Sequence, residues 1–401
     1  MPEYFIEHIT DVSEYFEIMA ANQNCVVGYR GPDAIMWDGK LHTLSLDGPD
    51  GAGGAAAKAL GTNSKGDIVG SWGTQGFARR ADGTTIYLGS LLSHESSLAD
   101  INDVGLAVGT YQQAGKSGIF TFDLNTNAVV DFGAPALVDQ VQATAINNSG
   151  DIVCKDRSTV IDSQAIFLLR SGVFLYLGIA SNLSARMPQI DNNGLVGANR
   201  KPTRQGSYTT EVSVYDIARP QLGWQPKGHL VIFDMNDTGI FAGTRSMGFP
   251  GASVVAPGWS WGTNSLSSGE WVPLCAQRVN NAGEIFGVST RWDAYPDMLG
   301  GDRRNFRGTL SPPPVNFRLE HPMLMRWPAP SAPWWVLPPV PHPPHGPWPS
   351  SPNDLDANSQ EIVRGLMLNR LAQDLTDEQA RELIKNASLD VIMRAVERLR
   401  R

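Results

Sequence analysis

Three histidines in the last quarter of the chain come closest to the spacing of a metal site. His342 and His345 are three residues apart, and His321 precedes them. A structural zinc site of this kind would add cysteine or further ligands in a defined pattern, but proline-rich sequence without cysteine or acid surrounds the pair. We therefore expect solvent-facing histidines in an extended segment, and no bound metal.

A second pattern, Asp191-Asn-Asn-Gly194, looks like half of a calcium loop. A calcium site needs more oxygen ligands, including a bidentate acid some residues later. Related segments recur along the chain without an acid at a constant offset. We interpret them as tight turns, in which the leading Asn or Asp side chain hydrogen-bonds to the backbone.

The sequence shows few other signs of a catalytic or metal-binding site. The sequence contains no His-Glu-x-x-His motif and no phosphate-binding loop. The three cysteines, Cys25, Cys154 and Cys275, are far apart, which argues against a disulfide framework and a Cys-x-x-Cys zinc site. Several of the 40 acids could meet in a channel, but their number alone is no evidence for a reaction. We predict a non-enzymatic protein without a cofactor.

The recurring turn is the strongest signal in the sequence. It consists of Asn or Asp, two residues, Gly, a short apolar or β-branched stretch and usually a second Gly. Because the first glycine follows a tight turn, we expect positive φ there, and asparagine is the next most tolerant residue type. The seven turn positions are Asn24, Gly66, Gly105, Gly150, Gly194, Gly239 and Gly283, with Asn24 replacing glycine in a degenerate copy.

The spacing of these turns predicts the fold. Successive positions are 42, 39, 45, 44, 45 and 44 residues apart, which is the range of a propeller blade built from several short strands. Strand-like segments flank further hairpin signals such as Asp38-Gly39, Asp82-Gly83 and Ser171-Gly172. We predict an all-β fold, a seven-bladed β-propeller over residues 1–311. The strand-rich start, Tyr4–Ile9, should pair with the last blade near residues 306–320 and close the ring.

The repeat units resemble HAF-type repeats, in which an Ile-Asn-x-x-Gly-x-Val-Val-Gly segment precedes a short strand and a glycine-containing turn. Ala145-Ile-Asn-Asn-Ser-Gly150 and Gly76-Phe-Ala-Arg-Arg-Ala-Asp-Gly-Thr84 are the closest matches, and the resemblance covers roughly residues 20–310. The resemblance implies a β-propeller. It implies no reaction, because the repeat rather than an activity defines this family.

Charge and hydropathy narrow the partners and the location. The net charge of −8 argues against nucleic-acid binding through a basic surface. No apolar run reaches the roughly 18 residues that span a bilayer, and the first residues show no basic segment followed by an apolar one. We expect no signal peptide and no membrane span, and a cytoplasmic location or a place in a virion or another large assembly.

Residues 312–353 form a different region, a proline- and tryptophan-rich extended arm. Fifteen of the 27 prolines lie there, and proline disfavours both long helices and central strands. Four tryptophans are costly to leave in water, so the arm should lie on its own propeller or on a partner. These predicted contact residues are Trp327, Trp334, Trp335 and Trp348.

Residues 354–401 contain one glycine and no proline, and three short helices are predicted there. A core of under 50 residues without disulfides or metal is marginal alone, so we expect the helices to dock on a second copy or on another protein. The apolar residues predicted to bind are Ile362, Leu366, Leu383, Ile392 and Val396.

The sequence thus favours a structural or protein-interaction module, a propeller disc tethered into a larger assembly such as a virion or a secretion apparatus through residues 312–401. An alternative is a receptor- or glycan-binding propeller with a single site on one face. A lectin with one site in every blade is disfavoured, because no aromatic residue recurs in every copy. A hydrolase with acids in the central channel is the third interpretation.

Overall fold

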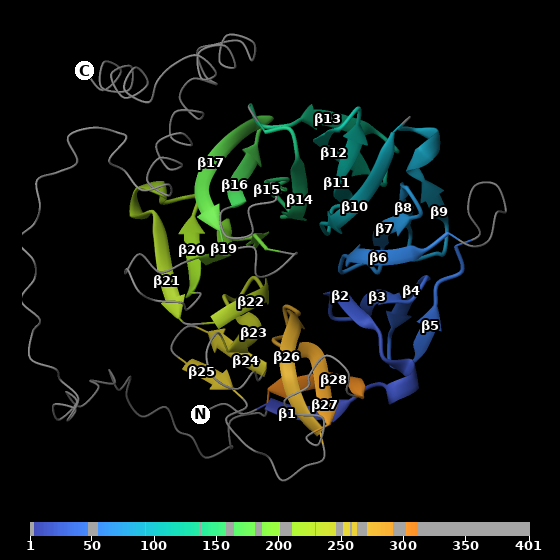
Figure 1. The fold of residues 1–401 in the computed structure, drawn as a ribbon, viewed down its shortest axis with the longest axis vertical. Helices are drawn as coiled ribbons and strands as arrows, with labels where there is room; N and C mark the ends of the chain where they lie inside the picture. The colour runs from blue at the N-terminus through green and yellow to red at the C-terminus, as the bar shows by residue number, and fades with distance from the viewer. Residues whose placement is uncertain are drawn as a thin grey trace, which may run out of the picture.

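The structure is a computed structural model, and it shows seven four-stranded antiparallel sheets around a central opening (Figure 1). This confirms the predicted seven-bladed β-propeller. The described residues are 4–46, 55–92, 94–136, 138–157, 164–180, 187–200, 211–228, 230–245, 252–256, 259–262, 271–291 and 302–310.

In blades 1 to 6 the chain runs from an inner strand beside the opening to an outer strand at the rim (Figure 1). The first three blades consist of β2 (Glu17–Ala21), β3 (Val26–Arg30), β4 (Asp33–Trp37) and β5 (Leu41–Thr43); β6 (Ala57–Thr62), β7 (Ile68–Trp72), β8 (Gln75–Arg79) and β9 (Thr85–Tyr87); and β10 (Glu95–Ile101), β11 (Leu106–Gln113), β12 (Lys116–Asp123) and β13 (Val129–Gly133).

Blades 4 to 6 repeat this order. They consist of β14 (Val141–Ile146), β15 (Ile152–Asp156), β16 (Gln164–Arg170) and β17 (Val173–Ala180); β18 (Gln189–Ile190), β19 (Leu195–Arg200), β20 (Glu211–Asp216) and β21 (Trp224–Gly228); and β22 (Leu230–Met235), β23 (Phe241–Arg245), β24 (Ala252–Ala256) and β25 (Trp259–Gly262). Three 3₁₀ turns complete the described elements, η1 (Val12–Glu14), η2 (Leu88–Ser90) and η3 (Pro220–Leu222).

Blade 7 is built from both ends of the propeller sequence. Its inner strands are β26 (Trp271–Val279), β27 (Ile285–Arg291) and β28 (Arg303–Leu310), and its outermost strand is β1 (Tyr4–His8). β1 pairs antiparallel with β28, from Tyr4 opposite Leu310 to His8 opposite Phe306. The Tyr4 hydroxyl also donates a hydrogen bond of 2.9 Å to the Gly283 carbonyl oxygen. The predicted ring closure is therefore confirmed.

The hydrophobic core is divided into seven clusters, one between each pair of neighbouring blades. Phe77 of blade 2 packs in one cluster with Val27 of blade 1, and Phe286 of blade 7 packs in another with Val26 and Ile35 of blade 1. Alternate residues of a strand point to opposite faces of its sheet. Each blade therefore packs side chains against both of its neighbours. The disc is complete without residues beyond Leu310.

The repeated turns join the inner strand of each blade to the next strand. All six predicted turn glycines have positive φ, between 77° and 91°. The expectation for Asn24 is wrong, because Asn24 is not among the described residues with positive φ. The degenerate turn is shorter: the Asn22 N–H donates to the Cys25 carbonyl, whereas in blade 2 the Asn63 N–H donates to the carbonyl of Asp67, four residues on.

The second glycine of the repeat is required for a different reason, because two strands approach each other closely there. In blade 2 the inner strand bulges between Ala59 and Gly61, opposite Gly70. A β-carbon on Gly70 would lie 1.9 Å from the carbonyl oxygen of Lys58. A side chain is therefore excluded by the bulge rather than by the turn.

The arm and the tail predicted for residues 312–353 and 354–401 lie outside the described residues. So do all nine residues predicted to bind a partner there. Within the part of the chain that is described, no helix is long and apolar enough to cross a membrane.

Candidate functional site at the central channel

Seven equivalent residues, one from each blade, surround the channel where the repeated turns begin. We call them the asparagine ring: Asn22, Asn63, Asn102, Asn147, Asp191, Asn236 and Asn280. In six of them the side-chain amide donates a hydrogen bond to the backbone carbonyl oxygen of the equivalent residue in the next blade. These bonds are Asn22 to Asn63 (2.5 Å), Asn63 to Asn102 (3.1 Å), Asn102 to Asn147 (2.9 Å), Asn147 to Asp191 (3.2 Å), Asn236 to Asn280 (2.8 Å) and Asn280 to Asn22 (3.3 Å).

Each ring residue also holds its own turn. The Asn147 Oδ1 atom accepts hydrogen bonds from the backbone N–H groups of Ser149 (3.0 Å) and Asp151 (2.9 Å), while Nδ2 of the same side chain reaches the next blade. Asn147 is 3% exposed, so both halves of its amide are used inside the protein, as buried polar groups require. The predicted Asx turns are present, and the same residues also connect the blades.

Asp191 interrupts the ring. Its Oδ1 atom accepts the Leu195 N–H at 2.7 Å, as in the other turns, but a carboxylate has no N–H to donate. Within the described part of the chain, no hydrogen bond joins the Asp191 side chain to the carbonyl of Asn236. Burial raises the pKa of Asp191; hydrogen bonds from Leu195 and Asn193 oppose this effect, and the nearby Asp237 charge adds to it.

A second, outer ring of Asn and Asp side chains lies one residue further along the turns. Each accepts the backbone N–H of the residue at the same position in the preceding blade. The acceptors are Asp103 from Ser64 (2.9 Å), Asn148 from Asp103 (2.9 Å), Asn192 from Asn148 (2.7 Å), Asp237 from Asn192 (2.8 Å) and Asn281 from Asp237 (3.1 Å). Burial alone would raise the pKa of Asp103, but hydrogen bonds from Asn148 and Ser64 lower it below its usual value.

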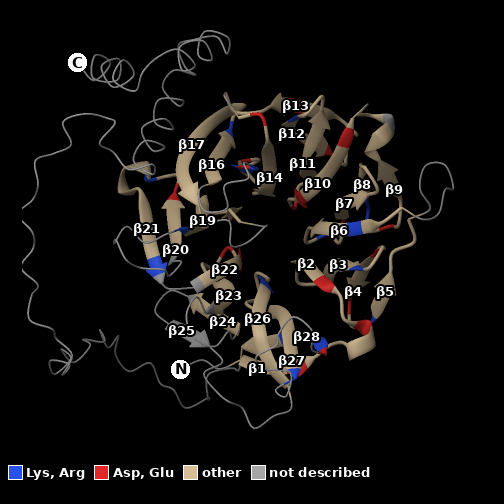
Figure 2. Ribbon diagram, viewed as in Figure 1, with Lys and Arg blue, Asp and Glu red and all other residues tan. Residues whose placement is uncertain are grey.

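The two rings frame one mouth of a cavity of about 190 Å³. Five aspartates and a single arginine, Arg278, are among its lining residues. The inner ends of β10, β22 and β26 bring charged positions to the central opening (Figure 2). Two of the acids, Asp100 and Asp234, lie in blades 3 and 6, and each accepts a backbone N–H at 3.0 Å, from Ile146 and Val279 respectively.

Arg278 connects three blades. Its Nε atom donates to the carbonyl oxygen of Met19 in blade 1 at 2.6 Å, and Nη1 donates to that of Phe233 in blade 6 at 3.0 Å. The residue is 4% exposed. Burial lowers the pKa of its guanidinium, against the opposing charges of Asp234 and Asp100.

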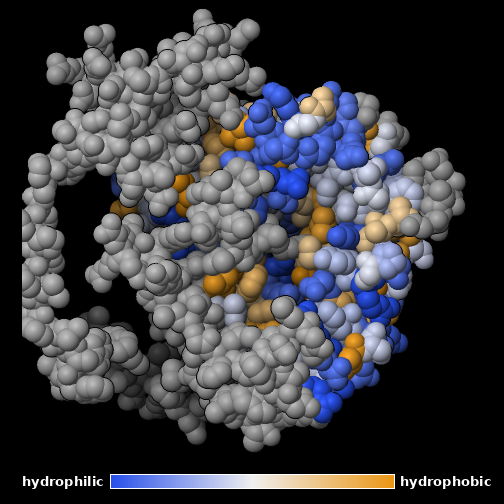
Figure 3. Space-filling view, viewed as in Figure 1, coloured by the Kyte–Doolittle hydropathy of each residue, from blue (hydrophilic) through white to orange (hydrophobic). Residues whose placement is uncertain are grey.

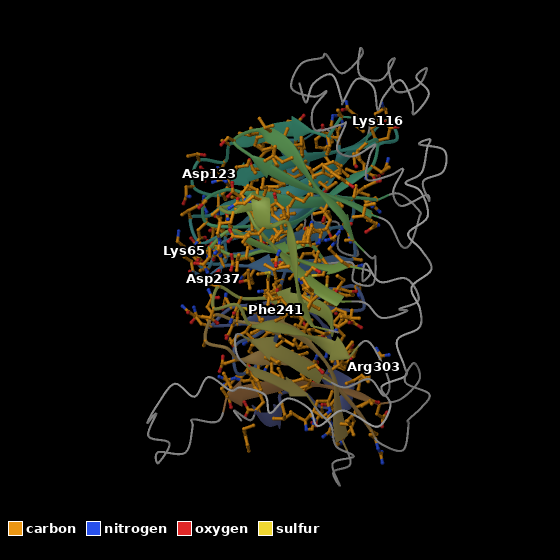
Figure 4. The ribbon with its side chains drawn as sticks, turned by 90° about the vertical axis from the view of Figure 1, so that its left-hand side faces the viewer. Lys65, Lys116, Asp123, Asp237, Phe241 and Arg303 are labelled. Atoms are coloured by element: carbon orange, nitrogen blue, oxygen red, sulfur yellow. The ribbon has the colours of Figure 1, made fainter. Side chains whose placement is uncertain are left out.

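The opposite face of the disc has a different pocket. Figure 4 shows the disc from its edge, with Lys65 and Asp237 on the face of the turns and Lys116 on the other. A cavity of about 380 Å³ lies at the far ends of the inner strands of blades 2 to 4. Hydroxyl and amide side chains dominate its lining, among them Ser97, Thr110, Gln112 and Gln142. Figure 3 views this face, where hydrophilic and hydrophobic residues both border the central hollow over these blades.

Sequence reasoning singled out the turn glycines and missed the residues that line the channel. Arg278, Asp234 and Asp100 share one repeat position, two residues before the ring residue, but other blades have residues such as Ala20 and Gln189 there. Because this position does not recur, internal comparison of the copies could not find it. The sequence did carry a signal for the hydrogen bonds between blades. Asparagine recurs at the ring position, although Asp or Ser could form the same turn.

One catalytic pattern was also overlooked in the sequence. Gly258-Trp-Ser-Trp-Gly262 has the letters of a Gly-x-Ser-x-Gly nucleophile elbow. Such an elbow needs a sharp turn from a strand into a helix. The structure instead places Trp259–Gly262 in β25, the outer strand of blade 6, paired antiparallel with β24. The hydrolase interpretation from channel acids stays a prediction.

Comparison with known proteins shows similarity in fold and no related family. No family model and no curated protein matches the sequence. Among solved structures, the β-propeller domain of the trilobed protease from Pyrococcus furiosus is 10% identical, with a TM-score of 0.45 over 74% of this chain and 97% of that one. The RRP9 WD40 repeats are 11% identical, with a TM-score of 0.45 over 77% and 100% of the two chains.

TolB from Acinetobacter baumannii is 15% identical, with a TM-score of 0.40 over 57% of this chain. The match spans 60% of the TolB chain, less than two thirds of its length. At these identities the similarities concern the fold alone.

Proposed function

We propose that this protein is a non-enzymatic structural or protein-interaction module, in which the propeller disc is tethered into a larger assembly by residues 312–401. The observation that carries the proposal is the position of Leu310. This residue ends β28, and it pairs with Tyr4 on the outermost strand of blade 7. The arm therefore starts near the rim of a finished disc and away from the channel.

The rim at this point also offers a contact surface. Phe5, on the outermost strand β1, is 68% exposed and lies opposite Thr309, one residue before the end of β28. A large exposed aromatic residue is costly in water and is typical of interfaces. The start of the arm and an exposed aromatic side chain thus occur together, which supports docking at this edge.

The ring and its seven core clusters close within the described part of residues 4–310, so we expect the disc to fold without the tail. Residues 354–401, in contrast, have apolar positions at helical spacing in fewer than 50 residues, too few for a stable core of their own. Such a segment can become stably helical by binding to a second copy or to another protein.

Sedimentation velocity on the full chain and on residues 1–311 tests the proposal. We expect residues 1–311 to sediment as a monomer and the full chain to form a larger species. Leu366→Asp with Ile392→Asp should abolish this assembly and leave the melting curve of the propeller unchanged, because the substituted residues lie outside the disc.

The matched control is Asn369→Asp with Asn386→Asp, which adds the same charge at polar positions of the tail. It should assemble like the wild type. A full chain that remains monomeric and binds no partner through its tail would contradict the proposal, as would equal loss of assembly in the control.

A second candidate, a glycan site on one face, is supported by the pocket of blades 2 to 4. Its hydroxyl and amide side chains offer both hydrogen-bond donors and acceptors. Titration of the full chain with a panel of neutral oligosaccharides tests it, with Gln112→Ala and Gln142→Ala as variants. Saturable binding that both variants weaken would support this site, and no binding would count against it.

A further inference from the structure

Arg278 has a hydrogen-bonding capacity that the fold does not use. Its Nε and Nη1 atoms donate to backbone carbonyls, including those of Met19 and Phe233. Among the described residues no hydrogen-bond partner is found for Nη2. Arg278 is also among the residues that line the channel cavity. The guanidinium is thus fixed by two neighbouring blades, while one of its nitrogens remains unpartnered in the lining of the cavity.

A buried charge of this kind is unusual. Arginine is rarely this buried unless it is paired. Its Nη2 atom is not among the fully buried side-chain atoms without a hydrogen-bond partner, so this nitrogen faces the open space of the channel. Yet no ion pair joins Arg278 to a carboxylate of the described residues; Asp234 and Asp100 act on it only through their electric field. The unused nitrogen is therefore available to an acceptor that enters the channel.

Polar groups predominate in the lining of the cavity, and apolar residues are interspersed among them. Met19 and Leu60 are apolar lining residues from blades 1 and 2, and Gln189 and Arg278 are polar ones from blades 5 and 7. A volume of about 190 Å³ admits a small organic molecule, since one water needs only about 10–15 Å³ of such space. Ligand sites are usually more apolar than this, so the lining favours a small, charged ligand over an apolar one.

The charges in this cavity restrict the ligand. A simple anion would meet the arginine but also the field of five aspartates, and a simple cation would meet the guanidinium at short range. A molecule that carries both charges satisfies both parts of the site. A carboxylate suits the guanidinium, because charge-assisted N–H···O bonds are the stronger ones.

We propose that the central channel binds a small zwitterion of the amino-acid type at Arg278. The ligand carboxylate accepts hydrogen bonds from Nη2, its ammonium group lies in the field of Asp100 and Asp234, and its side chain contacts Met19 and Leu60. This site does not involve the tail, so its test is independent of the test of the tethering function.

Isothermal titration calorimetry on the full chain, with thermal unfolding as a second readout, tests the proposal. The probes are L-alanine and L-valine, with acetate and ethylammonium as molecules that carry only one of the two charges. We expect saturable heat and a rise in melting temperature with both amino acids, and neither effect with acetate or ethylammonium.

Two variants test the charges. Asp234→Asn keeps an acceptor for the Val279 N–H but removes the negative charge, and it should weaken amino-acid binding by about tenfold or more. Arg278→Lys keeps a positive charge but loses the planar donor geometry, and it should abolish binding. Asp139→Asn is the matched control, because this exposed aspartate pairs with Lys116 outside the channel; it should bind like the wild type.

Arg278 also holds blades 1 and 6, so its variant could fail to fold; Asp234→Asn and Asp100→Asn then decide the question. Absence of saturable binding by the wild type would overturn the proposal. So would binding of acetate alone with equal affinity, or amino-acid binding that Asp234→Asn and Asp100→Asn leave unchanged.

Discussion

Asn280 in the last blade donates a hydrogen bond of 3.3 Å to the backbone carbonyl oxygen of Asn22 in the first blade. This bond links the two ends of the propeller at the channel, and the pairing of β1 with β28 completes the last blade at the rim. The junction between blades 7 and 1 is therefore secured both near the axis and at the edge of the disc.

The first prediction concerns the asparagine ring. Asn102→Ala removes both the bond to the Asn147 carbonyl (2.9 Å) and the acceptor for the Leu106 N–H (2.9 Å). Because Asn102 is 4% exposed, these partners are left unsatisfied, and we expect a loss of about 2–3 kcal/mol in the free energy of unfolding. Urea unfolding measures it. Asn192→Ala, at an exposed position of the outer ring, should cost less than half as much; equal losses would contradict a special role for the buried ring.

The second prediction concerns ring closure and uses two adjacent residues of β1. Tyr4 is 7% exposed and packs in the core between blades 6 and 7, whereas Phe5 is 68% exposed. Tyr4→Ala should lower the free energy of unfolding by about 3 kcal/mol, since it leaves a cavity and loses the bond to Gly283. Phe5→Ala should change it by less than about 0.5 kcal/mol. Similar unfolding curves for the two variants would show that β1 does not close the ring.

The number of blades followed from the sequence because the turn is a local structure. A tight turn with positive φ needs glycine at a fixed place, so Gly66 and Gly283 each mark the same turn of one blade, whatever surrounds them. The hairpins at Asp38-Gly39 and Ser171-Gly172 were predictable for the same reason, and Gly39, Ser171 and Gly172 all have positive φ.

The channel was not predictable, because it depends on distances between blades. Nothing local in the sequence shows that Asn102 reaches the Asn147 carbonyl 45 residues away, or that Arg278 lies between Met19 and Phe233. The error at Asn24 has a local origin. The comparison of copies placed Asn24 at the glycine position of a turn that is one residue shorter, but this shorter turn closes from Asn22 to Cys25 without positive φ at Asn24.

The third prediction separates the two costs of replacing a turn glycine. Gly105 and Gly115 have positive φ of 91° and 80°. A β-carbon at Gly105 would lie 3.0 Å from the Asn125 Nδ2 atom, whereas at Gly115 nothing lies within 4 Å. Gly115→Ala should therefore cost only backbone strain, about 1 kcal/mol, and Gly105→Ala should cost more, up to about 3 kcal/mol. Chemical unfolding of both variants checks this. A smaller cost at Gly105 would show that the contact with Asn125 gives way freely.

The last prediction concerns the one break in the asparagine ring. Asp191→Asn supplies the missing amide donor for the Asn236 carbonyl and keeps the acceptor for the Leu195 N–H. It also removes a buried charge close to Asp237. We expect the variant to be more stable than the wild type at neutral pH by about 1 kcal/mol or more, as measured by urea unfolding.

The pH dependence follows from the raised pKa of Asp191 in the folded protein. A carboxyl group of this kind stabilises the fold when it is protonated. Its contribution is complete below the ordinary Asp pKa near 3.8 and is lost as the pH rises through the folded-state value. The advantage of Asp191→Asn should therefore be small in acid and grow toward neutral pH. Asn147→Asp is the matched reverse change: it should destabilise the protein at neutral pH and recover part of that stability in acid. An advantage of Asp191→Asn that is constant across this range would show that the Asp191 charge is not what breaks the ring.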